Sequence, residues 1–362
     1  MTPVELSRTV LCAVRRAVDV GELDVSVPAS VAVGPPGPGG CGDYASNVAL
    51  RLAGQAGRPA RDVAEVLRPH IEGDPGVAEV TVTGPGFLNI TLAAGASAGL
   101  VEQVLEQGTR YGYGDTLAGQ LVELRVPYDT RAEIVADALV RIVATQGGRA
   151  EVRHAEPVNL RPVPAPEDPA LLGHDAARWA LLHPAAPDRP RISADHLLQR
   201  ESNPLFRVRY AHARTRALRR NAATLGYSHS HSHSHSHSHS HGHNSQSQSR
   251  VGVPTGTSGT GVSPAPAPAR FGTTPAETDL LAALADYPHA LRLAARDRAP
   301  DRVARHLVVT ADAVLGFQYT VLPLGDEKPS AAHRARLALA EAAGAVLAGG
   351  LSLLGISAPE YL

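Results

Sequence analysis

The chain has very little lysine, cysteine and tryptophan. Lys328 is the only lysine among 362 residues, so arginine supplies nearly all of the positive charge. The two cysteines, Cys12 and Cys41, are too few for a disulfide framework or a zinc site, which indicates a reducing compartment. Because the formal net charge is −1, no overall field attracts nucleic acid, and any basic binding surface must be local.

Segments that direct a chain to or through a membrane are also missing. The start, Met1–Glu5, has neither the basic residues nor the apolar run of a signal peptide. No uninterrupted apolar stretch reaches membrane-spanning length. We therefore expect a cytoplasmic protein without membrane contacts. A chain of this length has room for about two or three domains, each with its own core.

The first third of the chain alternates helical and strand patterns, which predicts a small α+β domain over 1–114. Apolar residues recur at three- and four-residue steps in its helical parts, and two short runs have strand character on either side of the turn Gly84-Pro85-Gly86. The expected helices are 2–22, one that carries Val48 and Leu52, one from Pro59 and 97–107, and the expected strands are 77–82 and 87–92.

The next segment, 115–200, predicts a single strand–helix–strand unit followed by a proline-rich linker. The strands are expected over 121–126 and 150–153, the helix over 131–146, and the linker over 157–169. A complete doubly wound nucleotide-binding domain needs more strands than this. We therefore interpret the segment as a spacer between two end domains.

Residues 203–220, NPLFRVRYAHARTRALRR, form one expected helix with one apolar face. Asn203-Pro204 is a favourable start, because a proline in the first turn loses no needed N–H. The remaining faces carry six arginines, with Tyr210 and His212 among them. A cationic helix with an interleaved aromatic residue suits RNA, whereas the alternative is an ordinary helix with a solvated basic face.

The end of the chain is helical throughout, which predicts an all-α bundle over 201–362. Its later helices are expected from Glu277, over 300–319 and over 331–354. A low-complexity insertion, about 226–270, interrupts the bundle and cannot bury apolar surface, so we expect it to be disordered.

The insertion begins with alternating serine and histidine, and eight of the seventeen histidines lie there. Imidazoles at this density bind Ni²⁺ or Zn²⁺ in vitro, whereas the alternative is a tolerated repeat expansion in a surface loop. The candidate metal ligands are His229, His231, His233, His235, His237, His239, His241 and His243.

Several strings resemble the arginyl-tRNA synthetases of class I. GDYASNVALRLA at 42–53 and GPGFLNITL at 84–92 are similar to the N-terminal additional domain of that family, and the match covers roughly 1–114. The helix at 203–220 and the final residues 350–360 resemble the DALR-type anticodon-binding domain. The family's aromatic-rich turn is replaced here by an arginine-containing one, and its final methionine by Tyr361-Leu362.

The resemblance implies two sets of tRNA-contacting residues. In the family, the N-terminal domain packs on the tRNA elbow, so Phe87 would stack on a D-loop base and Asn89 would hydrogen-bond a base edge, because period-two spacing places both on one sheet face. The alternative is a core Phe87 and a turn-capping Asn89. The predicted elbow set is Tyr44, Asn47, Phe87 and Asn89. The predicted anticodon-stem set is Arg207, Arg209, Tyr210, His212 and Arg214.

The family's two ATP-binding signatures are missing from this sequence. Pro127–Arg131 joins the strand at 121–126 directly to the following helix, without the His-x-Gly-His loop. A chain whose only lysine is Lys328 cannot carry the lysine-rich second signature. Because charge stabilisation in the transition state is usually the largest catalytic term, these absences oppose adenylate formation. Most of the catalytic domain is deleted, and we predict no catalytic residues and no cofactor.

Three functions remain open. The first is a non-catalytic protein that binds tRNA, of the kind that accepts arginine. The second is an arginine–tRNA ligase that uses ATP and is completed by a protein partner. The third is a metal-binding or protein-interaction scaffold that works through the His/Ser tract.

Overall fold

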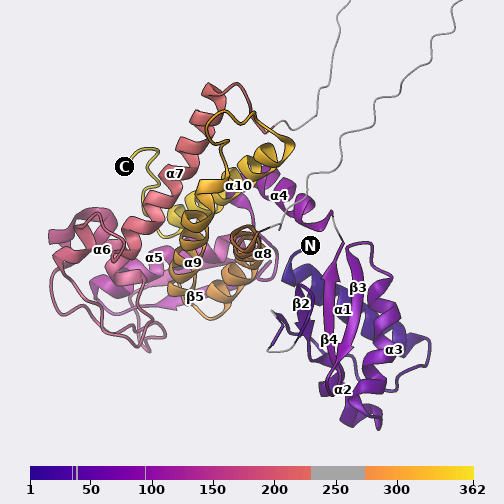
Figure 1. Cartoon of the computed structure of the whole chain (residues 1–362). Coiled ribbons are helices and arrows are strands. Elements are labelled where there is room, and N and C mark those ends of the chain that lie inside the picture. The colour runs from indigo at the N-terminus through magenta and orange to yellow at the C-terminus, as the bar shows by residue number, and fades with distance from the viewer. Residues whose placement is uncertain (35, 38–39, 94, 230–273) are drawn as a thin grey trace, which may run out of the picture.

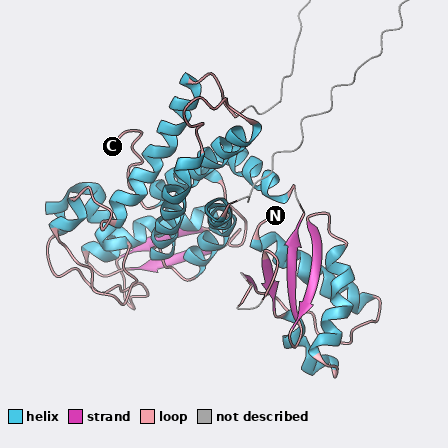
Figure 2. Cartoon of the chain, in the orientation of Figure 1, coloured by secondary structure: helices cyan, strands magenta, loops and turns pink. Residues whose placement is uncertain are grey.

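The computed structural model describes the whole chain except residues 35, 38–39, 94 and 230–273, which are grey in Figure 1. Most of the described chain is helical, and its strands form two small sheets (Figure 2). The predicted combination of a small α+β domain, a strand–helix–strand remnant and a helical C-terminal domain is confirmed.

The N-terminal domain packs helices against a four-stranded antiparallel sheet in the order β1-β2-β4-β3 (Figure 1). Its own apolar core contains residues from Leu6 to Ile90. The helices are α1 (Pro3–Asp19), α2 (Val48–Ala56) and α3 (Ala60–Glu72), and the strands are β1 (Val33–Gly34), β2 (Tyr44–Ser46), β3 (Val77–Thr83) and β4 (Phe87–Leu92).

Local sequence explains how α1 begins and how β3 turns into β4. Thr2 and Glu5 form a capping box at the start of α1, in which each side chain accepts the backbone N–H of the other residue. Between the strands, Gly86 has φ 135°, and a Cβ there would lie 2.7 Å from the backbone of Ala60. Only glycine fits this close approach of the turn to α3.

The sequence did not predict β1 and β2. They contain two and three residues, too few for a period-two pattern, and they follow a Pro/Gly-rich loop. They exist because of long-range pairing, in which Ala45 lies opposite Asn89 and Tyr44 opposite Ile90. The sheet is therefore wider than the two strands read from the sequence.

The predicted strand–helix–strand unit is present, and its two strands are parallel over their full length. After it, the chain runs through irregular structure to a short helix. The elements from the end of the N-terminal domain onwards are α4 (Ala96–Gln107), β5 (Leu121–Arg125), α5 (Thr130–Thr145), β6 (Arg149–Arg153) and α6 (Gly173–Leu182).

Four long helices make up the C-terminal bundle, and α10 contacts α4, α7, α8 and α9. A single apolar core runs from Leu100 through α5 and α6 to Ile356, so the strand–helix–strand unit is packed against the bundle. The bundle helices are α7 (Pro204–Thr224), α8 (Pro275–Arg296), α9 (Asp301–Phe317) and α10 (Ala331–Leu353).

One described helix, α10, is long and apolar enough to cross a membrane by length and composition alone. Its apolar residues are interrupted by Arg336 and Glu341, so it is not the uninterrupted apolar stretch that the sequence analysis considered. In this structure 67% of its most apolar part is buried inside the protein, as expected for the central helix of a bundle.

Candidate nucleic-acid interface and the remnant of a nucleotide-binding unit

Phe87 and Asn89 line one cavity of about 340 Å³ in the N-terminal domain. Phe87 is the first residue of β4 and is 41% exposed, so one face of its ring can stack on another ring. The cavity is completed by the β3–β4 turn, by β2 and by the glycine-rich loop before β2. The other residues that line it are Gly37, Gly40, Ala45, Thr83, Gly84 and Pro85.

The side-chain amide of Asn89 is held in one orientation. Its Nδ2 donates to Thr83 Oγ1 at 2.6 Å and to the Thr81 carbonyl at 3.3 Å, which uses both N–H groups. A Cβ at Gly40 would lie 2.9 Å from Asn89 Oδ1, so the loop approaches this amide as only glycine can. The side chain is 2% exposed, and Oδ1 is the atom with acceptor capacity left.

The other two predicted elbow residues lie elsewhere. Tyr44 is half-buried, and burial, followed by the carboxylates of Asp43 and Asp286, raises its pKa to about 12. Since Asp286 belongs to α8, Tyr44 faces the bundle and does not line the Phe87 cavity. Asn47 is exposed at the N-cap of α2 and makes no capping hydrogen bond.

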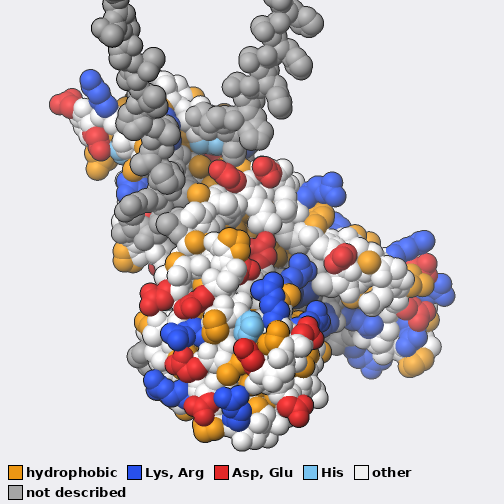
Figure 3. Space-filling view, turned by 90° about the vertical axis from the view of Figure 1, so that its right-hand side faces the viewer, with side chains coloured by type: hydrophobic (Ala, Val, Ile, Leu, Met, Phe, Trp, Pro, Cys, Tyr) orange, Lys and Arg blue, Asp and Glu red, His pale blue; other side chains and the backbone are white. Residues whose placement is uncertain are grey.

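Acidic and basic side chains are interspersed on the face of the N-terminal domain that Figure 3 turns to the viewer. No large region of one sign stands out there, in agreement with the net charge of −1. A polyanion would therefore be positioned on this domain by specific contacts more than by a broad positive field.

The predicted anticodon-stem arginines on α7 already have partners within the protein. Arg207 Nη1 is 2.7 Å from Asp312 on α9, and Arg214 Nε donates to Gln318 Oε1 at 2.7 Å. Arg209 Nη2 lies 3.8 Å from the Asp175 carboxylate of α6. The helix thus uses part of its charge to attach α6 and α9.

The last six residues, Ser357–Leu362, lie along α7, and we call them the C-terminal segment. His212 is buried and its Nδ1 donates to the Pro359 carbonyl at 2.8 Å, while burial lowers the pKa of this imidazole. Glu360 forms an ion pair with Arg216, and the Arg220 guanidinium lies 4.2 Å from the centre of the Tyr361 ring.

Tyr210, the aromatic member of the α7 set, stacks on Phe206 with ring centroids 5.5 Å apart. It is half-buried, so part of the ring stays accessible. The sequence did not predict the role of Glu360. A lone acidic residue near the end of the chain does not indicate with which arginine it forms an ion pair.

The N-terminus of α5, where a nucleotide-binding unit would meet phosphates, is closed by the protein's own groups. Asp129 Oδ1 accepts the Ala132 N–H at 2.9 Å and caps the helix. Arg131 is only 1% exposed and donates exclusively to backbone carbonyls of the following segment. These acceptors are the carbonyls of Val163, Leu181, Pro184, Ala185 and Asp188, at 2.6 to 3.1 Å.

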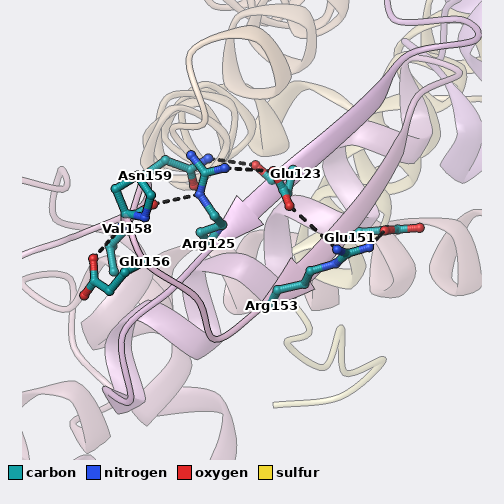
Figure 4. Close-up of polar contacts among 8 residues, drawn as sticks. Glu123, Arg125, Glu151, Arg153, Glu156, Val158 and Asn159 are labelled. Atoms are coloured by element: carbon teal, nitrogen blue, oxygen red, sulfur yellow. Dashed lines mark hydrogen bonds and ion pairs between the residues drawn. The ribbon is translucent and has the colours of Figure 1, made fainter.

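The outer edge of β5 is covered by the segment that the sequence predicts as a linker (Figure 4). Asn159 Oδ1 accepts the Arg125 N–H at 2.8 Å, and Asn159 Nδ2 donates to the Glu123 carbonyl at 3.0 Å. The Asn159 backbone N–H donates to the Arg125 carbonyl, also at 3.0 Å. The segment thereby satisfies the edge that a further strand would otherwise pair with.

Alternating charges cover these two strands, as Figure 4 also shows. Arg125 pairs with Glu123 at 2.9 Å, and Arg153 pairs with Glu151 at 2.9 Å and reaches Glu123 at 3.9 Å. The side chains of these four residues are between 28% and 61% exposed. Such a surface is typical of contact with water and not of burial under a second layer of helices.

The predicted metal-binding tract falls almost entirely outside the described residues, because His231–His243 lie within 230–273. His229 is described, and its Nδ1 lies 2.9 Å from Glu341 Oε1 of α10. Within the described part of the chain, no group of three or more His, Cys, Asp or Glu side chains has the arrangement of a metal site.

Comparison with known families places the two end domains. Residues 5–92 match the arginyl tRNA synthetase N terminal domain, and residues 255–362 match the DALR anticodon binding domain. The C-terminal domain thus matches a domain model named for anticodon binding. More particularly, both end domains are similar to domains of arginyl-tRNA synthetases, as the sequence resemblance predicted.

Individual relatives match only part of the chain. An arginine–tRNA ligase of Frankia alni is 41% identical over 157 residues, which is 41% of this chain and 28% of the relative. One from Renibacterium salmoninarum is 39% identical over 160 residues, 41% of this chain and 29% of the relative. The matched region therefore spans less than a third of these curated relatives, in agreement with a truncated catalytic domain.

Two solved structures share the fold. Thermus thermophilus arginyl-tRNA synthetase aligns with a TM-score of 0.63 at 14% identity, covering 100% of both chains. Plasmodium falciparum arginyl-tRNA synthetase aligns with a TM-score of 0.62 at 9% identity, covering 99% of both chains. At these identities the likeness concerns the fold alone.

Proposed function

We propose that this protein binds an arginine-accepting tRNA but does not attach arginine to it. The observation that carries the proposal is the cavity in which an exposed Phe87 ring lies beside an oriented Asn89 amide. A ring that stacks on an unpaired base and an amide that accepts from a base edge are the two contacts used to recognise single-stranded RNA. We expect the protein to work in the cytoplasm.

The anticodon-binding domain would supply a second contact region around α7. Arg219 is exposed near the C-terminal end of α7, and Tyr210 keeps part of its ring accessible. Contacts of arginine to phosphate position an RNA without reading its sequence. Two separated contact regions on one chain bind one RNA more tightly than either does alone.

The closed remnant supports a non-catalytic role. The loop before α5 has no imidazole or glycine, Arg131 binds five carbonyls beside the helix start, and Asn159 covers the edge of β5. A partner that completed the domain in trans would have to displace Asn159 and bury the charged pairs of β5 and β6. The alternative, an arginine–tRNA ligase assembled with a protein partner and ATP, therefore requires rearrangement of this unit.

A gel-shift titration with tRNA(Arg) at two salt concentrations tests the proposal. The expected affinity is strongly salt-dependent, because phosphate contacts release counterions. Binding that is absent, or insensitive to salt, would contradict the proposal. An arginine-dependent ATP–pyrophosphate exchange assay with the pure protein separates the alternative, since turnover would show that the chain forms the adenylate.

A further inference from the structure

A cavity of about 780 Å³ lies between the N-terminal domain and the groove between α8 and α9. Its volume falls in the range of small-molecule binding sites. Most of its walls are apolar or small, from α1, β1, α8 and α9. The apolar and small lining residues are Pro3, Val33, Gly34, Ala276, Ala282, Ala283, Val309, Ala313 and Gly316.

The polar groups that line this cavity are acidic or neutral. The cavity-lining residues include Asp279, Asp286 and Asp312, and no lysine or arginine is among them. Asp312 is paired with Arg207, whereas the Asp279 carboxylate makes no hydrogen bond or ion pair with a described residue. The unbalanced charge is therefore negative, and it is carried by α8.

A buried imidazole supplies a second, independent feature. The His306 side chain is 9% exposed, and its Nε2 donates to the Ala283 carbonyl at 3.0 Å. Burial lowers the pKa of His306, so the ring is neutral at neutral pH and Nδ1 carries a lone pair. This Nδ1 lies 4.0 Å from Asp286 Oδ2. Two acceptors thus face each other without a hydrogen between them.

The spacing of the two α8 carboxylates defines the shape of a matching ligand. Asp279 and Asp286 are seven residues apart, which places them on one side of the helix, separated by about 10 Å along its axis. The small side chains of Ala282 and Ala283 lie between them in sequence and line the same cavity. The arrangement is acidic at two points and apolar in between.

We propose that this cavity binds a linear aliphatic polyamine. One ammonium group donates to His306 Nδ1 and to the Asp286 carboxylate, a second meets Asp279, and the methylene chain lies on the alanines of α8. Three N–H donors of a single ammonium group can satisfy both facing acceptors. The site is separate from the Phe87 cavity, so the inference does not depend on the proposed tRNA binding.

Isothermal titration of the full-length, RNA-free protein with spermidine tests the inference, with hexylamine and hexanediol as probes that carry one and no ammonium group. The expected order of affinity is spermidine, hexylamine, hexanediol. Asp286→Asn keeps the side-chain shape and is expected to weaken spermidine binding about tenfold or more. Asp326→Asn, an exposed acid outside the cavity, is the matched control and is expected to leave binding unchanged.

A steric variant gives an independent measurement. Gly316 lines the cavity, and a Cβ there would meet nothing within 4 Å, so Gly316→Leu adds a side chain in open space. We expect this variant to fold, since leucine favours a helix more than glycine does, and to lose spermidine binding. The inference would be overturned if the unaltered protein did not bind spermidine. It would also be overturned if the Asp286→Asn and Gly316→Leu variants bound spermidine as tightly as the unaltered protein does.

Discussion

The N-terminal domain and the C-terminal bundle each contain residues that the sequence assigns to tRNA contact, but the surroundings of these residues differ. In the N-terminal domain, Phe87 keeps 41% of its surface exposed beside an oriented Asn89. In the bundle, Arg207, Arg214 and His212 are bonded to other parts of the protein. The first region presents its groups to a ligand, whereas the second uses many of its groups to hold helices and the C-terminal segment.

The difference shows that the match of a residue to a family motif does not determine whether its side chain is accessible to a ligand. A residue type at the right position in a family string predicts where a side chain lies in the fold. Whether the side chain is free depends on which acid or carbonyl another element brings to it, and for α7 those acceptors come from α9 and the C-terminal segment. We therefore expect the Phe87 cavity to contribute more to RNA affinity, per residue, than the α7 arginines.

The largest expected effect concerns the stability of the bundle relative to the N-terminal domain. Arg131→Met would remove the donor of five hydrogen bonds to backbone carbonyls, and we expect unfolding of the bundle core to become easier by about 3–5 kcal/mol. Denaturant unfolding followed by Trp179 fluorescence measures this, because Trp179 is buried in that core. Arg149→Met, at an 80% exposed side chain, is the control. Equal stability of the two variants would contradict the prediction.

The next effect tests the Phe87 cavity directly. Phe87→Ala removes the stacking surface and is expected to weaken tRNA binding by about 1–3 kcal/mol, while Phe87→Trp keeps binding. A gel-shift titration measures both. Tyr128→Ala removes an aromatic ring that is 88% exposed on the other part of the protein, and it should have little effect. If Tyr128→Ala weakens binding as much as Phe87→Ala, the assignment of the interface is wrong.

Acid is expected to weaken the bundle more than the N-terminal domain. Burial lowers the pKa of His183, His212, His289 and His306, all of which lie after residue 115. Near these pKa values the unfolded chain binds more protons than the folded chain does. The contribution of the neutral imidazoles to folding stability is therefore full above about pH 6.5 and is lost as the pH falls below it. Calorimetry should show a lower Tm of the bundle at about pH 5 than at about pH 7.5. We expect the Tm to fall by about 2–4 °C for each kcal/mol of stability that is lost.

A bundle transition that stayed in place on acidification, while the N-terminal transition moved, would contradict this assignment. His212→Gln provides a matched variant, because it removes one titrating group and keeps a donor for the Pro359 carbonyl. Its bundle should lose less stability between the two pH values than the unaltered protein.

The smallest expected effect asks whether the C-terminal segment competes with RNA for α7. Glu360→Gln removes the charge that pairs with Arg216, and we expect tRNA affinity to rise about two- to fivefold, since exposed ion pairs are weak. The salt dependence should become steeper as the freed arginine meets phosphate. Glu201→Gln, an exposed acid before α7, is the control. Equal affinity of the two variants would show that the segment does not cover a binding surface.

Much of the fold could be predicted from the sequence, because the longer helices and the β3–β4 hairpin have recognisable local sequence patterns. The helices at α1, α5, α7 and α10 have repeating apolar positions, and the β3–β4 hairpin has a glycine–proline turn between two short apolar runs. The strands β1 and β2 could not be predicted from local sequence, because β2 pairs with β4, more than forty residues away, and β1 pairs with β2. The proline-rich segment was read as a linker for the same reason, since its partner is the edge of β5.

The amino-acid sequence by itself determined the family of the two end domains, the missing ATP signatures and the placement of Phe87 and Asn89 on one strand. These properties depend on residue identity and short spacing alone. Only the tertiary structure decided that Arg131 binds five carbonyls, that Glu360 meets Arg216, and that the N-terminal domain and α8 enclose an acidic cavity. Those contacts join residues far apart along the chain, and their partners are set by how whole elements pack.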